Sequence, residues 1–68
     1  SKYRRLLMRT FYSNDGKRIS RIMRVGGGIT EVDLYERGAF VRTVDCSDHS
    51  IYWAEDVADN WCTRVIRE

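Results

Sequence analysis

The sequence lacks any apolar run that approaches the ~20 residues needed to span a bilayer. Its first residues, SKYRRLLMR, break off too early for a secretory signal peptide. We therefore expect no membrane contact and a cytoplasmic location.

Thiol and imidazole groups are also scarce, since Cys46, Cys62 and His49 are the only ones. Two cysteines allow at most one disulfide, whereas small secreted domains with little hydrophobic core contain several. We therefore expect two buried free thiols. A zinc site would need Asp45, Asp48 or a water as a further ligand, and the spacing matches no closed structural site. The sequence therefore predicts no metal and no cofactor.

Groups arranged for catalysis are equally few. A chain of 68 residues buries only ~60% of the surface that its unfolded form exposes, which leaves little room for an enclosed substrate pocket. Cys46 and His49 have the chemistry of a nucleophile and its base, but burial of Cys46 argues against that role. The glycine run at 26–28 lacks the Lys-Ser/Thr pair of a phosphate-binding loop. We predict a non-enzymatic protein.

What the sequence does have is an uneven distribution of charge. Residues 1–25 carry eight bases and one acid, and residues 26–68 carry four bases and nine acids, so their formal charges are +7 and −5. These two parts could steer partners of opposite charge, or neutralise each other within the fold or across a homodimer.

Turn chemistry predicts two β-hairpins. Three-residue loops with glycine in the third position are expected at 13–17 (SNDGK) and at 35–39 (YERGA). The glycine run at 26–28 would join the hairpins. A short helix over 17–25 is the alternative to a strand there, because Ile19, Ile22 and Met23 have helical spacing.

These loops set an expected register for each hairpin. In the second hairpin, Leu34 would pair with Phe40 and Val32 with Arg42, which gives a core face. That face carries Val32, Leu34, Phe40, Val44 and Cys46. In the first hairpin, Phe11 would pair with Ile19 and Leu7 with Met23, and Arg9 would face Arg21. This last pair is destabilising unless it splays apart or binds an anion. The opposite face would show Leu6, Met8 and Ile22 among cationic side chains.

The C-terminal segment has the pattern of an amphipathic helix entered at Ser47 or Asp48. Its apolar half is formed by Ile51, Ala54, Val57, Ala58, Trp61, Cys62, Val65 and Ile66. Tyr52 and Trp53 fall outside that half and are a candidate contact surface.

Together these elements predict one α+β domain over 1–68: a four-stranded antiparallel meander with the helix packed on one face. One helix covers one side of such a sheet, so the other side stays open as a partner or homodimer interface. The final hairpin and helix loosely resemble the second part of a double-stranded-RNA-binding domain. The helix, however, begins DHSIYWAED where that family carries a lysine cluster, so we do not adopt this resemblance.

We expect a protein-binding module, an inhibitor or adaptor, that acts through the arginine-rich first hairpin. In size and layout it resembles the compact inhibitors that bacteriophages use against host or defence machinery, such as anti-CRISPR proteins. Nucleic-acid binding by the same basic hairpin is the alternative. The candidate binding residues are Arg4, Met8, Arg9, Tyr12, Arg18, Arg21, Ile22, Arg24, Tyr52 and Trp53.

Overall fold

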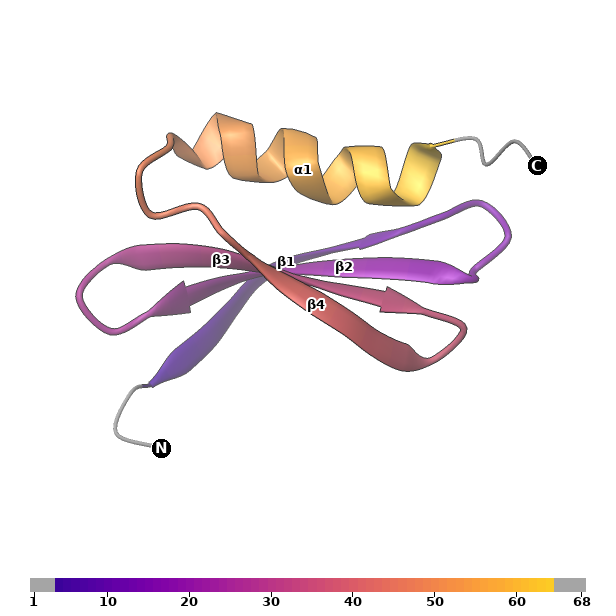
Figure 1. The fold of residues 1–68 in the computed structure, drawn as a ribbon, viewed down its shortest axis with the longest axis horizontal. Helices are drawn as coiled ribbons and strands as arrows, with labels where there is room; N and C mark the ends of the chain where they lie inside the picture. Colours follow the sequence, from indigo (N-terminus) through magenta and orange to yellow (C-terminus); the bar gives the residue numbers. More distant parts are fainter. Residues whose placement is uncertain (1–3, 65–68) are drawn as a thin grey trace.

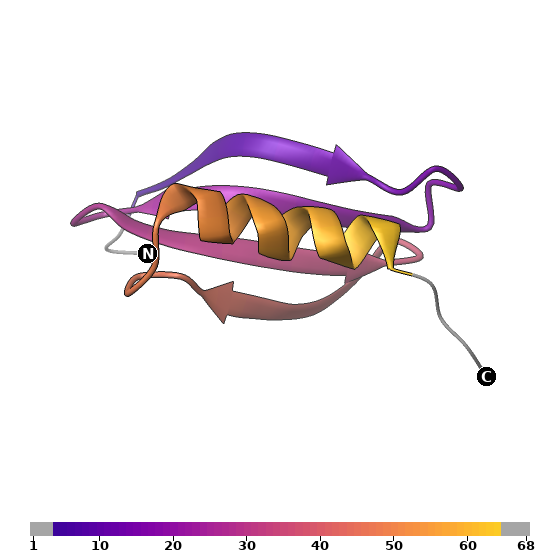
Figure 2. The same cartoon turned by 90° about the horizontal axis from the view of Figure 1, so that it is seen from above.

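A computed structural model describes residues 4–64 and confirms the α+β architecture. Four antiparallel strands form one sheet in the order β1-β2-β3-β4, and helix α1 packs on it (Figures 1 and 2). The strands are β1 (Arg5–Tyr12), β2 (Arg18–Val25), β3 (Ile29–Glu36) and β4 (Ala39–Asp45), and α1 is Ile51–Thr63. The stretch for which a helix was the alternative is therefore strand β2.

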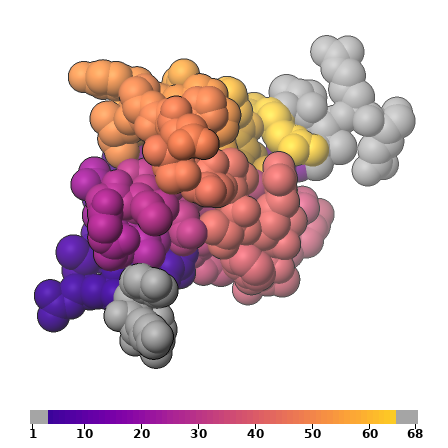
Figure 3. Space-filling view, turned by 60° about the vertical axis from the view of Figure 1, so that its left-hand side comes forward, coloured from indigo at the N-terminus to yellow at the C-terminus, as the bar shows by residue number. Residues whose placement is uncertain are grey.

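Helix α1 lies on one side of the sheet only. Seen from one end in space-filling form, α1 occupies the top of the molecule and the strands form the lower part (Figure 3). We call the sheet side under α1 the helix face and the other side the open face.

The turn between β3 and β4 is tighter than predicted. Glu36 pairs with Ala39, so the turn has two central residues, Arg37 and Gly38. Both have positive φ, 52° and 80°, as in the type I′ turns that match the twist of paired strands. The expected three-residue loop is wrong here.

A bulge then changes the register of β4. Leu34 pairs with Arg42 and Tyr35 with Phe40, which leaves Val41 as the extra residue. The predicted core position of Phe40 is wrong, because the bulge places it on the open face beside Tyr35. The two rings meet edge to face with their centroids 5.8 Å apart, and Phe40 is 58% exposed.

The turn of the first hairpin is one residue longer than the predicted three-residue loop, since Tyr12 pairs with Ile19 and the Ser13 N–H donates to the Arg18 carbonyl oxygen at 2.9 Å, and a second bulge, at Met8 in β1, offsets the extra residue. Arg9 pairs with Ile22 rather than with Arg21, whereas the Leu7–Met23 pair is as expected. Ile22, in the uninterrupted strand β2, lies on the helix face and is 1% exposed, so its predicted place on the open face is wrong. The expected pairs of Arg9 with Arg21 and of Phe11 with Ile19 do not form, since Phe11 pairs with Ser20.

The helix begins later than the sequence indicated. Ser50 is the N-cap, and its Oγ accepts a hydrogen bond from the backbone N–H of Trp53 at 3.3 Å. Ser47 instead belongs to the preceding turn, where its N–H donates to Asp45 Oδ1 at 2.9 Å. The predicted apolar half is confirmed over the described residues, and Val65 and Ile66 lie outside them.

The core is thin and lies between α1 and the two central strands. It consists of Ile22, Val32, Leu34, Cys46, Ala54 and Ala58. The small side chains of Ala54 and Ala58 allow the helix backbone to come close to the sheet. At this contact the buried Ser20 hydroxyl donates to the carbonyl oxygen of Ala58 at 2.8 Å, which satisfies its polar group.

The side of the first hairpin that α1 covers can be tested by truncation. Ile22→Ala should lower the free energy of unfolding by about 2–5 kcal/mol, because it leaves a cavity under the helix. Leu7→Ala, at a side chain that is 57% exposed, should cost less than about 0.5 kcal/mol. Urea unfolding measures both, and Ile22→Val supplies a milder variant. A larger loss for Leu7→Ala would contradict the observed register.

Candidate functional site

The open face is the largest surface of the sheet that no other element covers (Figure 1). Residues that lie opposite each other on adjacent strands form rows across it. The row nearest the hairpin turns is Tyr12, Ile19, Tyr35 and Phe40, with one residue from each strand. We call this set the cross-sheet row.

The cross-sheet row is apolar and accessible at both ends. Tyr12 is 67% exposed on one edge strand and Phe40 is 58% exposed on the other, and the residues between them are half-buried. Directly beside the row, the Arg21 guanidinium lies 5.1 Å from the centre of the Tyr35 ring. Aromatic side chains and arginine on one surface are typical of protein interfaces.

Sequence reasoning missed the cross-sheet row, because the predicted register placed Phe40 in the core. The signal that could have revealed it is the Arg37-Gly38 dipeptide. In a type I′ turn these two residues alone would connect the strands, and the position of Phe40 would follow.

The centre of the open face is polar and is satisfied within the fold. Asp33 is 4% exposed, and both of its carboxylate oxygens accept hydrogen bonds from Arg5 Nη2 at 3.0 Å. The Thr43 hydroxyl donates to Asp33 Oδ1 at 2.7 Å. Arg5 Nη2 also donates a hydrogen bond to Glu31 Oε1 at 3.1 Å. The hydrogen bond to Asp33 raises the pKa of Arg5 above its ordinary value.

The candidate arginines do not form one patch. Arg9 lies on the helix side, 3.2 Å from Glu55 and with its guanidinium 4.4 Å from the centre of the Phe11 ring. Arg24 also points to the helix face, where its Nε is buried without a hydrogen-bond partner among the described residues. Arg21 lies on the open face, and Arg4 is exposed just before β1. The sheet thus divides the basic residues between its two sides.

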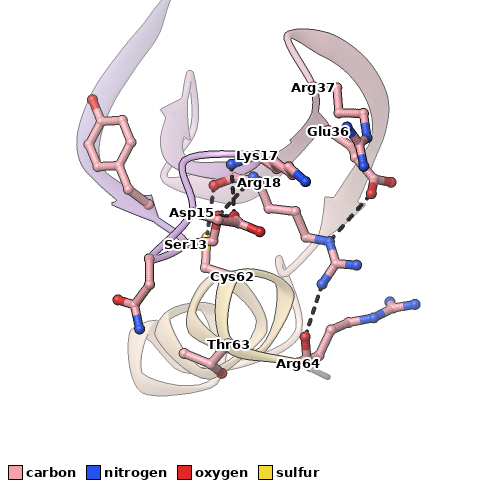
Figure 4. Close-up of a pocket in the computed structure, with 11 residues that line it drawn as sticks. Ser13, Asp15, Lys17, Arg18, Glu36, Arg37, Cys62, Thr63 and Arg64 are labelled. Carbon is pink, nitrogen blue, oxygen red and sulfur yellow. Dashed lines mark hydrogen bonds and ion pairs between the residues drawn. The ribbon is translucent and has the colours of Figure 1, made fainter. Parts of the chain in front are cut away.

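Arg18 is a structural residue. It is largely buried, and its Nη1 donates to the carbonyl oxygen of Arg64 at 3.0 Å while its Nε lies 3.6 Å from Glu36. These contacts tie β2 to β3 and to the end of α1 (Figure 4). Such a side chain is committed to the fold and is not free to contact a partner.

Ion pairing within the described residues follows the charge asymmetry of the sequence. Each pair joins an arginine of the first hairpin to an acid in the later part of the chain: Arg5–Glu31, Arg5–Asp33, Arg9–Glu55 and Arg18–Glu36. The two oppositely charged parts therefore neutralise each other in part inside the fold.

The aromatic candidates on the helix lie far from the open face. Tyr52 and Trp53 are exposed on α1, as predicted, and the Trp53 ring stacks on His49 with centroids 3.8 Å apart. Met8 is exposed at the β1 bulge. The candidate residues are thus distributed over at least two surfaces.

A polar basin of about 740 Å³ lies where the two hairpin turns meet the end of α1 (Figure 4). Two of the charged side chains that line it, Asp15 and Arg18, have partners within the fold. Asp15 accepts hydrogen bonds from the Lys17 N–H at 2.9 Å and from the Ser13 hydroxyl at 2.7 Å, and these two bonds lower its pKa. The Lys17, Arg37 and Arg64 side chains also line the basin, and they make no ion pair within residues 4–64.

The thiol and imidazole groups are not arranged for chemistry. Cys46 is 1% exposed, and burial, followed by the charges of Asp45 and Glu31, raises the pKa of its thiol above the ordinary value. A raised thiol pKa disfavours the thiolate, which is the nucleophilic form. Both cysteines are free and buried, as predicted. Within residues 4–64 no three potential metal ligands come together, and no helix is long and apolar enough to cross a membrane.

Comparison with known proteins found no family model, curated protein or solved structure that matches this chain.

The Arg5–Asp33 contact generates a stability prediction. Arg5→Met should lower the free energy of unfolding by about 1–3 kcal/mol, because it leaves a buried carboxylate without its charged partner. Arg42→Met is the matched control, since Arg42 is exposed and makes no ion pair within residues 4–64. Urea unfolding compares them.

The double variant Arg5→Met/Asp33→Leu separates the pair from its individual members. It should recover part of the stability lost in Arg5→Met, because neither charge is then left buried alone. Equal losses in Arg5→Met and Arg42→Met would show that the contact has no net effect.

Proposed function

We propose that this chain is a non-enzymatic binding module and that a partner protein docks on its open face. The cross-sheet row carries the proposal. Tyr12 and Phe40 are both more than half exposed, at opposite edges of one continuous apolar row. Exposed apolar patches of this kind are a mark of interaction sites.

The polar centre of the open face supports a protein partner. Because Asp33 is already paired with Arg5 and Thr43, docking over it would not bury an uncompensated charge. Arg21, beside the row and without an ion pair among the described residues, is available to a carboxylate of the partner.

The charge balance of the open face also favours protein over nucleic acid. The strand register places two arginines, Arg5 and Arg21, and three acidic residues, Glu31, Asp33 and Asp45, on this face. Binding to a phosphate backbone requires several unpaired basic side chains, whereas this face carries more acidic than basic residues. An inhibitor or adaptor in the cytoplasm, of the kind that bacteriophages use, is the form of this function that the small size and layout suggest.

The test is affinity capture from a lysate of the organism that encodes the chain, after nuclease treatment. Tyr12→Asp and Phe40→Asp should each weaken capture of the same protein by about thirtyfold or more, as loss of an interface anchor does. Tyr52→Asp is the matched control, because it makes the same change at an exposed tyrosine on α1. Capture that survives Tyr12→Asp and Phe40→Asp would refute the proposal.

A second copy of the chain is the other protein that this face could bind. Light scattering over a concentration series distinguishes the two cases, because a homodimer dissociates on dilution. A dimer that Phe40→Asp dissociates would replace the foreign partner with a second copy.

Nucleic-acid binding is the second candidate, and one observation favours it. Arg21 lies over the Tyr35 ring in the middle of the sheet, and Tyr12 is exposed in the same row. Aromatic side chains flanked by arginine form stacking platforms for single strands. If an oligonucleotide binds there, Arg21→Glu should reduce the salt slope of its affinity by about one, whereas a protein interface would leave oligonucleotide affinity negligible throughout.

A further inference from the structure

A groove on the helix face is separate from the open face. Helix α1 packs against β1, β2 and β3, and makes no close backbone contact with β4. The view from above shows β4 beside the helix rather than beneath it (Figure 2). The helix-facing side of β4 is therefore left uncovered, and a groove of about 350 Å³ runs between β4 and α1.

Most of the side chains that line the groove are apolar. Leu34 and Val44 contribute from the sheet, and Val57 and Trp61 from the helix. Trp53 also lines the groove and is 38% exposed. The Trp61 indole N–H donates to the carbonyl oxygen of Tyr35 at 2.8 Å, so this ring is held in a fixed orientation.

The charged side chains that line the groove are all positive. Arg42 and Arg64 line it, and no carboxylate does. Neither arginine makes an ion pair within the part of the chain that the structure describes. This contrasts with Arg5, Arg9 and Arg18 of the first hairpin, which are paired. The groove is therefore complementary to an acidic ligand.

The backbone beside the groove can accept another strand. β4 is an edge strand, so one side of its backbone has no neighbour in the sheet. The bulge at Val41 lies near the start of β4 and leaves the segment from Arg42 to Asp45 in regular pairing with β3. An extended segment added along this edge would direct every second side chain into the groove.

We propose that the groove between α1 and β4 binds an extended segment of a partner protein that carries both apolar and acidic side chains at its groove-facing positions, which are every second residue. The segment pairs with the edge of β4, places its apolar side chains between Trp53 and Val44, and offers its carboxylates to Arg42 and Arg64. This site does not depend on docking at the open face.

A library of random seven-residue peptides, fused to a carrier protein and selected on the immobilised chain, tests the ligand chemistry. We expect enrichment of sequences in which positions two residues apart carry apolar and acidic side chains. No enrichment over blank support, or enrichment of basic peptides, would overturn the proposal.

The selected peptide, titrated by fluorescence anisotropy, tests the location. Trp53→Ala should weaken binding by about thirtyfold and Arg42→Glu by about tenfold, as for an interface anchor and a facing charge. Arg21→Glu and Tyr12→Asp are controls on the open face and should leave the affinity unchanged. Loss of binding in these controls with retention in the groove variants would place the peptide on the open face instead.

Hydrogen exchange tests the mode of binding. Bound peptide should slow exchange of backbone amides within β4, because new hydrogen bonds form along its edge. Binding that needs Trp53 but leaves these amides unprotected would refute strand addition. A chain that dimerises on its own and loses the dimer in Arg42→Glu would show that a second copy, not an acidic segment, fills the groove.

Discussion

The width of one α-helix is the constraint on which the rest of this structure depends. A helix is about 10 Å across, and four strands spaced about 4.8 Å apart form a wider surface than it can cover. α1 packs over the central strands, where Ala54 and Ala58 allow close approach to Ile22 and Val32. One whole face of the sheet, and the helix-facing side of β4, are left without intramolecular cover. Both proposed interaction surfaces exist because one helix is too narrow to cover the whole sheet.

Internal neutralisation of charge is the second determinant. From the sequence alone, the basic first part of the chain looks like one continuous binding surface. In the fold, Arg5, Arg9 and Arg18 pair with acids from β3 and α1, and the sheet directs the basic side chains to opposite sides. The arginines that remain for a partner are few and separate, which favours local recognition by single carboxylates over a continuous path for a phosphate backbone.

The architecture could be read from the sequence because it depends on repeating patterns. Alternation of apolar residues, the glycines of the turns and the helical spacing from Ile51 to Cys62 identified every element and the buried half of the helix. The pairing of side chains could not be read, because it depends on single residues. Val41 and Met8 each add one residue to a strand, and each addition moves residues of the same strand, Phe40 in β4 and Phe11 in β1, to the face opposite the one that strict alternation predicts.

The same reasoning explains the limits of the predicted site. Alternation along a strand predicts which face a residue lies on only if no bulge interrupts the strand. Tyr12 follows the bulge at Met8, so the sequence did not predict that it shares a row with Phe40. Ion pairs such as Arg18 with Glu36 join residues from neighbouring strands, and their partners follow from the final register rather than from composition. Exposed residues of α1 were found correctly because nothing interrupts the helical period.

The two bulges also give the chain tolerance to a change in length. Without Met8, residues 5–7 and 9–11 would alternate regularly, and each would keep the face that it has now. The same holds for β4 without Val41. A deletion of one codon at either point would therefore preserve the core, whereas a deletion in β2 or β3, which pair without interruption, would exchange buried for exposed side chains on one side of the gap. Length variation in this fold is thus compatible with the edge strands and not with the central ones.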